Sequence, residues 1–348
     1  MRYTIELSYA GAGFCGWQNQ PDAPSVQQCL EHALGTLLGT PTPVIGAGRT
    51  DAGVNAIAYI ACFDGPEDLE ADIFCYKLNA ILPASVAVAS VSPACPDFHA
   101  RFDARRREYT YLLHRVKDPF VAGYSYYFGY PAFDVDAMNR AAAMLVGTHD
   151  FSCFEKTGAD NKTSVCTVFE AFWAPYTPTH VRLMGSVAPS VPVTGMHSNT
   201  TVDSAVACAS AFGKAMPVQG NPCGPMTGPL PFADGKAGMD SQYWYFRIAA
   251  DRFLRNMVRA IVGTLLEIGR GKRTPADFAT LILPPDTPQS SGAASASDSD
   301  AFISGARTSG SGNISPNAGA ARQPRTTRRS LAGQSVPAHA LFLSKVEY

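Results

Sequence analysis

The 348-residue sequence is poor in charged residues and contains no long uncharged apolar run. Only 16% of its residues are charged, whereas 46% are hydrophobic, the usual share for a globular protein. The net charge of −1 excludes a wholly disordered chain, because disorder combines few apolar side chains with a large net charge. A transmembrane helix needs about 18 apolar residues in succession, so none is expected. The chain is long enough for one large domain or two ordinary ones.

The cysteines lack the spacings of metal or disulfide sites. There are nine of them, an odd number, and no CxxC pair occurs. Free thiols in a reducing cytoplasm fit this pattern best. The first residues show no basic segment followed by an apolar one, so no secretory signal is visible, and we expect a cytoplasmic protein. No P-loop or zinc spacing is present, which indicates neither a nucleotide cofactor nor a metal.

Charge is distributed unevenly along the chain. Residues 1–100 contain three basic and ten acidic side chains, whereas residues 101–348 contain 25 and 19. Much of the positive charge lies in two clusters: Arg101, Arg105, Arg106 and Arg107, and then Arg247, Arg252, Arg255, Arg259, Arg270, Lys272 and Arg273. Clusters of this kind either bind a polyanion or form ordinary solvated surface, and charge alone does not decide between these interpretations.

Hydrophobic patterning predicts an α/β unit in residues 1–100. Strands are expected near residues 2–9, 43–45, 57–63 and 86–91, and helices near 25–38 and 68–80. Ser25 followed by Gln28 is a capping-box pattern that marks the start of the first helix. The order β-α-β-β-α-β is typical of a split βαβ sandwich with its helices on one face of the sheet.

Residues 101–348 show a similar mixture of elements. Strands are expected at 107–116, 165–173, 242–250 and 341–347, and helices at 135–146, 251–269 and 275–283. Two stretches, at about 177–239 and 285–335, are rich in Pro, Gly, Ser and Ala. Such composition buries too little apolar surface to offset chain entropy, so both are predicted to be mobile insertions.

The segment Gly46-Ala-Gly-Arg-Thr-Asp-Ala-Gly-Val-Asn-Ala56 surrounds one Arg and one Asp with small residues. It lies between two expected strands, where a rigid scaffold can present a side chain to a substrate. Gly48 and Gly53 allow backbone conformations that are closed to other residues. Asp51 is therefore a candidate nucleophile or base. The alternative is an Asp that only stabilises a turn.

Two further motifs come from the second part of the chain. In the expected strand Arg107-Glu-Tyr-Thr-Tyr111, Tyr109 and Tyr111 share a face and could stack on a base, or form an ordinary surface pair. In a helix over 251–269, the arginines at 252, 255 and 259 would share one face, either solvated or paired with a carboxylate such as Asp51. Gly263 costs a helix about 1 kcal/mol relative to Ala, so close packing is predicted there.

Together these motifs resemble the TruA-type tRNA pseudouridine synthases. The matching segments are GRTDAGV (48–54), the Arg-x-Tyr-x-Tyr strand (107–111) and FLRNMVRAIVGTLLEIGRGK (253–272). The resemblance covers most of the chain outside the two insertions. It implies an α+β pseudouridine synthase fold, with two ferredoxin-like or RRM-like halves, residues 1–100 and 101–348, whose mainly antiparallel sheets join across a central catalytic cleft. It also implies an isomerase that converts uridine to pseudouridine at tRNA positions 38, 39 and 40, in the anticodon stem-loop.

The resemblance assigns roles by motif match. Asp51 is the expected nucleophile, Arg259 its ion-pair partner, and Tyr109 the side chain that stacks on the target uridine. Further substrate-binding candidates are Arg49, Arg107 and Arg255. The implied partners are tRNA and a second copy of the chain, with no membrane, metal or cofactor. One departure is visible, because Asn55 stands where the family usually has His.

Other classes of protein remain as alternatives. A non-catalytic protein on the same fold could bind structured RNA through its aromatic and basic side chains. A hydrolase of glycosidic bonds would need two carboxylates flanking the bond, and the nearest candidate beyond Asp51 is Asp64. A structural protein is disfavoured by the Gly-rich loop around Asp51.

Overall fold

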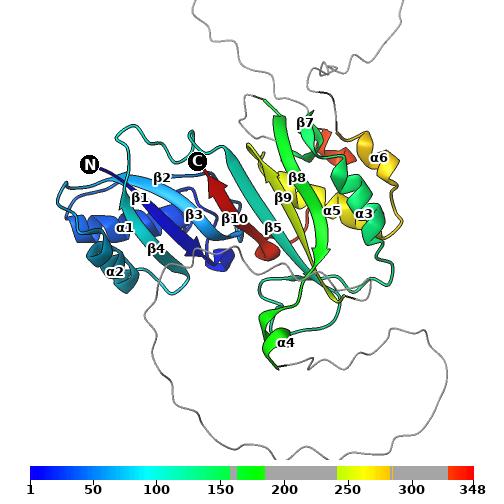
Figure 1. Cartoon of the computed structure of the whole chain (residues 1–348), viewed down its shortest axis with the longest axis horizontal. Helices are drawn as coiled ribbons and strands as arrows, with labels where there is room; N and C mark the ends of the chain where they lie inside the picture. The colour runs from blue at the N-terminus through cyan, green and yellow to red at the C-terminus, as the bar shows by residue number, and fades with distance from the viewer. Residues whose placement is uncertain (157–162, 185–240, 283, 285–327) are drawn as a thin grey trace, which may run out of the picture.

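The computed structural model describes residues 1–156, 163–184, 241–282, 284 and 328–348. Its strands are β1 (Arg2–Tyr9), β2 (Ile45–Gly46), β3 (Asn55–Asp64), β4 (Val86–Pro93), β5 (Arg106–His114), β6 (Tyr126–Tyr127), β7 (Gly147–Asp150), β8 (Val165–Pro175), β9 (Tyr243–Ala250) and β10 (Leu341–Glu347). These described strands form one sheet in the order β4-β1-β3-β10-β5-β9-β8-β7, with β2 paired to β3 and β6 paired to β5 (Figure 1).

The helices lie beside the two ends of this sheet. They are α1 (Val26–Leu38), α2 (Ala71–Ile81), α3 (Val135–Ala143), α4 (Thr179–Met184), α5 (Met257–Gly269) and α6 (Pro275–Ala279), with 3-10 turns η1 (Gly11–Gly13), η2 (Ser152–Phe154), η3 (Arg328–Leu331) and η4 (Ala338–Ala340). Helices α1 and α2 lie beside β1, β3 and β4, whereas α3, α5 and α6 lie beside β5, β9 and β8 (Figure 1). The predicted α+β class is confirmed. Within the described residues, no helix has the length and apolarity that crossing a bilayer requires.

Strand β10 occupies the middle of the sheet although it comes from the end of the chain (Figure 1). It runs antiparallel to β5, from the pair Leu341–Tyr111 to the pair Glu347–Arg106. On its other side it runs parallel to β3 over two residue pairs, which include Leu343–Ala56. The two halves predicted from the sequence therefore share one continuous sheet.

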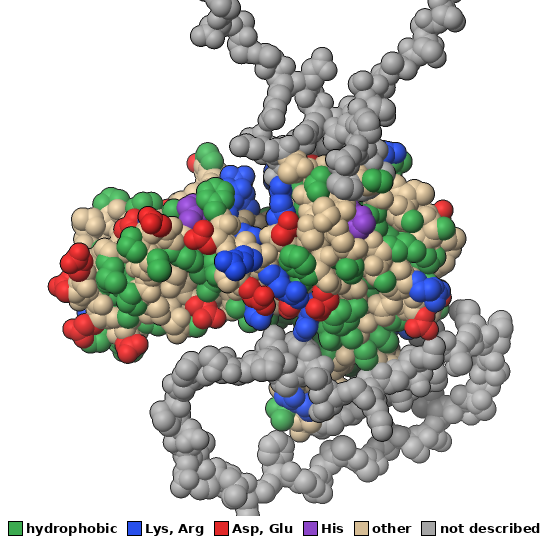
Figure 2. Space-filling view, turned by 45° about the horizontal axis from the view of Figure 1, so that its top comes forward, with side chains coloured by type: hydrophobic (Ala, Val, Ile, Leu, Met, Phe, Trp, Pro, Cys, Tyr) green, Lys and Arg blue, Asp and Glu red, His purple; other side chains and the backbone are tan. Residues whose placement is uncertain are grey.

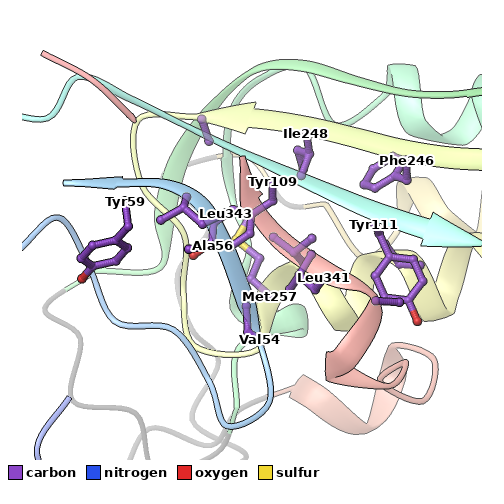
Figure 3. Close-up of a cluster of buried hydrophobic side chains, with 14 of the residues drawn as sticks. Val54, Ala56, Tyr59, Tyr109, Tyr111, Phe246, Ile248, Met257, Leu341 and Leu343 are labelled. Atoms are coloured by element: carbon purple, nitrogen blue, oxygen red, sulfur yellow. The ribbon is translucent and has the colours of Figure 1, made fainter. Parts of the chain in front are cut away.

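The core at this junction is built from alternate residues of the central strands. Tyr109 of β5, Ile248 of β9 and Leu343 of β10 lie close together, with Met257 of α5 and Val54 beside them (Figure 3). All five side chains are buried. Because neighbouring residues of a strand point to opposite faces, this alternation is what fills one face of the sheet.

Helix α5 begins six residues later than the sequence predicts. Asn256 adopts a left-handed conformation with φ of 65°, which a helix interior does not allow. Before it, the Asp251 carboxylate accepts hydrogen bonds from the backbone N–H groups of Arg252 (2.6 Å) and Thr167 (2.9 Å), which fixes a loop. The prediction that Arg252, Arg255 and Arg259 share one helix face is therefore wrong, because only Arg259 belongs to α5.

Residues 332–337, here called the strap, cross the outside of α5. The N–H of Val336 donates to the carbonyl of Arg259 (3.2 Å), and Nε of Arg259 donates to the carbonyl of Val336 (2.7 Å). A Cβ atom at Gly263 would collide with the carbonyl oxygen of Gln334. The close packing predicted at Gly263 is confirmed, and the strap provides it.

Part of each predicted insertion has defined structure and contacts with the rest of the protein. η3 and residues 332–335 of the strap fall within the predicted stretch 285–335, yet Arg329 fixes them through hydrogen bonds to the carbonyl of Gly333 (2.8 Å) and to Oγ of Ser335 (2.7 Å). Helix α4 falls within the predicted stretch 177–239, and Nε2 of its His180 lies 2.9 Å from a carboxylate oxygen of Asp118. The remainder of both predicted insertions, like their expected mobility, lies outside the described residues.

Replacing Gly263 by Ala should destabilise the protein. Ala would favour the helix by about 1 kcal/mol, but the collision with the strap should cost about 1–3 kcal/mol and outweigh that gain. Urea unfolding of the two proteins measures the difference. The control is Gly35→Ala in α1, where the nearest neighbour of an added Cβ is the Thr40 carbonyl oxygen at 3.5 Å. This control should be more stable than the parent by about 0.5–1 kcal/mol. Stabilisation by both changes would contradict the packing described for the strap.

Candidate active site

Residues 47–54 form the Asp51 loop, which connects β2 to β3. The side chain of Asp51 is 25% exposed, so its carboxylate is accessible from outside. Lys and Arg side chains gather where the two halves of the molecule meet, with acidic side chains among them (Figure 2). The loop presents an accessible carboxylate, with the exposed Arg49 on the loop itself and Nε of Arg255 3.8 Å from Asp51.

A floor of three buried aromatic residues, Tyr9, Trp17 and Tyr59, supports the Asp51 loop. The rings of Trp17 and Tyr59 stack with their centroids 4.1 Å apart. The hydroxyl of Tyr9 shares a hydrogen bond of 2.9 Å with Thr50, and the hydroxyl of Tyr59 donates to the backbone carbonyl of Gly48. Burial raises the pKa of both phenols, so they stay protonated as donors.

Close backbone approach explains two of the glycines near the loop. Gly16 has φ of 94°, and a Cβ atom there would collide with the carbonyl oxygen of Thr50. A Cβ atom at Gly11 would collide with the carbonyl oxygen of Val54. The turn-rich stretch after β1 therefore lies directly against the backbone on both sides of Asp51, and only glycine fits at these contacts.

Asn55 connects this turn to the segment that leads into β10. Its Oδ1 accepts a hydrogen bond from the N–H of Gly11 (2.8 Å), and its Nδ2 donates to the carbonyl of His339 (2.7 Å). The side chain is 2% exposed. Asn55 therefore joins the Gly11 turn to the segment before β10 through buried hydrogen bonds at the end of the Asp51 loop.

Tyr109 lies in the middle of β5, paired with Leu343 of β10 and Ile248 of β9. Its ring meets the edge of Phe253, with centroids 5.0 Å apart and planes at 87°. Burial raises the pKa of the Tyr109 phenol, and the nearby Asp51 carboxylate raises it further. The site therefore holds a neutral phenol beside a carboxylate.

Asp51 pairs with Arg255 instead of Arg259. Nε of Arg255 lies 3.8 Å from Oδ1 of Asp51, and the Arg255 side chain is 56% exposed. Arg259 makes no ion pair with Asp51 within 4.0 Å among the described residues, and its Nε donates to the strap. This corrects the pairing predicted from the sequence. The cause is the late start of α5, which leaves Arg255 on a loop that reaches Asp51; the catalytic role of Arg259 stays a prediction.

The other two predicted binding arginines differ in orientation. Arg49 is exposed on the Asp51 loop, and its Nε donates to Oε1 of Gln18 (3.1 Å). The guanidinium of Arg107 instead donates to backbone carbonyls, among them that of Ala47 (2.8 Å). Burial lowers the pKa of Arg107. Arg49 is thus available to a ligand, whereas the expected substrate contact of Arg107 has no support in this geometry.

Sequence reasoning missed several parts of the site. The aromatic floor left only a weak signal, the alternation of large residues in β1 and β3. Phe253 lay within the helix predicted over residues 251–269, so its contact with Tyr109, which depends on the loop before α5, was not predicted. Gln18, which accepts a hydrogen bond from Arg49, was not singled out as a site residue. The site nevertheless brings three chemical groups together at one junction: the carboxylate of Asp51, the exposed guanidinium of Arg255 and the neutral phenol of Tyr109.

Comparison with known proteins identifies the class. The profile of the tRNA pseudouridine synthase family matches residues 7–103 and 141–304. The protein is 34% identical over 349 residues to tRNA pseudouridine synthase A of Porphyromonas gingivalis, covering 100% of this chain and 97% of that relative. It is 38% identical over 282 residues to the Bacteroides fragilis protein of the same name, covering 81% and 86%. The chain belongs to the TruA family of tRNA pseudouridine synthases.

A third relative shows a similar degree of identity. The tRNA pseudouridine synthase A of Solidesulfovibrio magneticus is 34% identical over 301 residues, covering 85% of this chain and 87% of that relative. The family resemblance drawn from the three motifs is therefore confirmed.

Substituting Arg255 and Arg259 by Ala should separate an exposed ion pair from a structural contact. Loss of the half-exposed Arg255 should change the free energy of unfolding by less than about 1 kcal/mol. Loss of Arg259 removes a charged hydrogen bond to the Val336 carbonyl and should cost about 1.5–3 kcal/mol. Urea unfolding with unchanged m-values checks both. An equal or larger loss for Arg255→Ala would contradict the contacts described.

Proposed function

We propose that this protein converts uridine to pseudouridine in tRNA, with Asp51 as the catalytic nucleophile. The observation that carries the proposal is the Asp51 carboxylate, held on a fixed loop beside Tyr109 and paired with Arg255. Family membership supplies the reaction and the substrate class. By the same resemblance, the target lies at positions 38, 39 and 40, in the anticodon stem-loop.

The reaction rearranges bonds within one nucleotide. The N1–C1′ glycosidic bond breaks, the uracil turns, and a C5–C1′ bond forms; C5 loses a proton and N1 carries one in the product. Nothing is oxidised, so the balance requires no redox partner. The Asp51 carboxylate has three routes open to it: addition to the base, attack on C1′, or removal of a sugar proton. Each route needs an ionised, accessible carboxylate.

The target base must leave its stack before Asp51 can reach it, at a cost of a few kcal/mol. Stacking on an aromatic ring offsets about 1–3 kcal/mol of that cost. Two observations support this role for Tyr109: its neutral phenol lies near Asp51, and the ring of Phe253 meets its ring edge-on. We assign Tyr109 to the target uridine on this basis.

Arginines around the junction would hold the RNA backbone. The exposed side chains are Arg49, Arg101, Arg105 and Arg255. Phosphate contacts of this kind set position and orientation and carry no sequence information. We assign Arg49 and Arg255 to substrate binding, with selection of the tRNA resting on its shape. Arg259 is assigned to the catalytic machinery through the family resemblance and its place in the first turn of α5, directly after the loop that carries Arg255.

The hydrolase alternative is inconsistent with the geometry. Asp51 precedes β3, whereas Asp64 ends it, ion-paired with Arg2 at 2.7 Å. The ten residues of β3 span about 30 Å, far beyond the roughly 5–9.5 Å between the carboxylates of glycosidases. No specific observation favours the alternative of a non-catalytic RNA-binding protein.

The family resemblance supports three finer proposals. We infer a homodimer, a cytoplasmic location, and a division of the chain near residue 100 into two halves that meet at the site. The division is supported by the order of strands, since β4, β1 and β3 lie on one side of β10 and β5, β9 and β8 on the other.

Tritium release tests the proposed reaction directly. A tRNA labelled with tritium at C5 of uridine should lose label to water when the protein forms the C5–C1′ bond. The Asp51→Asn variant should release none and still bind the RNA, because its amide cannot act as the carboxylate. Absence of release by the wild type, with RNA bound, would favour a non-catalytic binding protein.

Two substitutions at Tyr109 should separate stacking from proton transfer. Tyr109→Phe keeps the ring, so it should retain most activity if stacking dominates. Tyr109→Ala loses about 1–3 kcal/mol of stacking and should slow single turnovers by about five- to 150-fold. Rate constants at saturating enzyme provide the comparison. Equal loss in both variants would show that the hydroxyl takes part in the chemistry.

A further inference from the structure

The guanidinium of Arg107 is fully occupied by backbone carbonyl oxygens. Arginine has five N–H donors. Here Nε and Nη2 both donate to Ala47 (3.2 and 2.8 Å), Nη2 also to Arg101 (2.7 Å), and Nη1 to Ala104 (3.3 Å) and Asp251 (2.7 Å). These five bonds use every donor, so no N–H group is left for a phosphate.

Two of the four carbonyl acceptors, those of Ala47 and Asp251, each lie four residues before a charged residue of the site. Ala47 is four residues before Asp51, and Asp251 is four residues before Arg255. The loops that follow these carbonyls provide the two partners of the 3.8 Å ion pair. Arg107 therefore holds the starting points of both loops from one strand, β5.

The Arg107 side chain also has a fixed position relative to Tyr109, the residue proposed to bind the base. Arg107 and Tyr109 are two residues apart on β5 and point to the same face of the sheet. A Cβ atom at Gly48, the neighbour of Ala47, would be 3.6 Å from Nε of Arg107, so the loop packs directly on the guanidinium. One rigid strand thus positions the ring of Tyr109 and both charged loops together.

We propose that Arg107 is a positioning residue that sets the Asp51 and Arg255 loops in register with Tyr109, and that it does not bind RNA. The inference rests on the proposed pseudouridine synthase activity. Its chemistry needs a guanidinium, because four carbonyls converge from three segments of the chain and require planar, forked donors. A lysine keeps the charge but has only three donors at one point.

The test is Arg107→Lys, compared with the wild type in three measurements. The single-turnover rate at saturating enzyme should fall about ten- to a hundredfold, since small displacements of reacting groups have effects of this size. The dissociation constant for tRNA and its salt dependence should stay close to those of the wild type, because Arg107 itself contacts no phosphate and the long, exposed side chain of Arg255 can still reach one from a slightly displaced loop. Hydrogen exchange should become faster at the amides of residues 48–51 and 252–255.

The matched control is Arg115→Lys, directly after β5. Arg115 also donates to carbonyls, those of Tyr130 (2.9 Å) and Pro131 (3.1 Å), but at the other end of the strand. It should lose stability and keep the wild-type rate. An equal loss of rate in this control would show that the effect of Arg107→Lys comes from general destabilisation, and it would overturn the proposal.

Two other results would also overturn it. An Arg107→Lys variant with the wild-type rate would show that the loops need no guanidinium. Weaker binding with a salt dependence reduced by about one phosphate contact would assign Arg107 to RNA instead. Hydrogen exchange does not depend on catalysis, so it tests the positioning role of Arg107 even if the wild type releases no tritium. Absence of tritium release would count against the proposed activity alone.

Discussion

Strand β10 pairs with β3 on one side and with β5 on the other, and the location of the site follows from this double pairing. The start of β3 carries the Asp51 loop, and the middle of β5 carries Tyr109. Without the strand between them, these residues would belong to separate sheets. The parallel contact with β3 is only two residue pairs long, so neighbouring side chains must reinforce it. Asn55 does so through its hydrogen bond to the segment just before β10.

Side chains hold the loops of this site where no backbone ladder is available. Buried carbonyl and N–H groups in irregular segments must find partners, and an unpaired one costs free energy comparable to a lost hydrogen bond. Asn55, Arg107 and Arg259 supply partners for three such segments. The polar side chains nearest the site are thus divided between a structural group facing inward and an exposed group available to a ligand.

The regular elements were largely predictable from the sequence. Period-two alternation identified β1 and β3, and the cap at Ser25 marked the start of α1. The Asp51 loop was predictable because small residues crowded around two charges, between two strands, indicate a tightly packed loop that presents those charges. Gly263 was informative for a similar reason, since a glycine inside an apolar helix needs a close neighbour.

The errors arose where tertiary contacts override local preference. Residues 251–256 favour helix by pattern, but the left-handed Asn256 and the bonds of Asp251 impose a loop. Composition suggested that residues 328–335 had no partner, yet α5 provides one. Arg107 was grouped with its charged neighbours, although its place on the Tyr109 face pointed inward.

The central position of β10 also bears on how the protein is made. Synthesis proceeds from the N-terminus, and the strands on either side of β10 emerge from the ribosome long before it does. Until then β5 has an unpaired edge along the stretch that β10 later covers, and such an edge is a template for pairing with other chains. The nascent protein therefore passes through an interval in which the gap at its centre is both the unfinished site and its point of greatest exposure to misassembly.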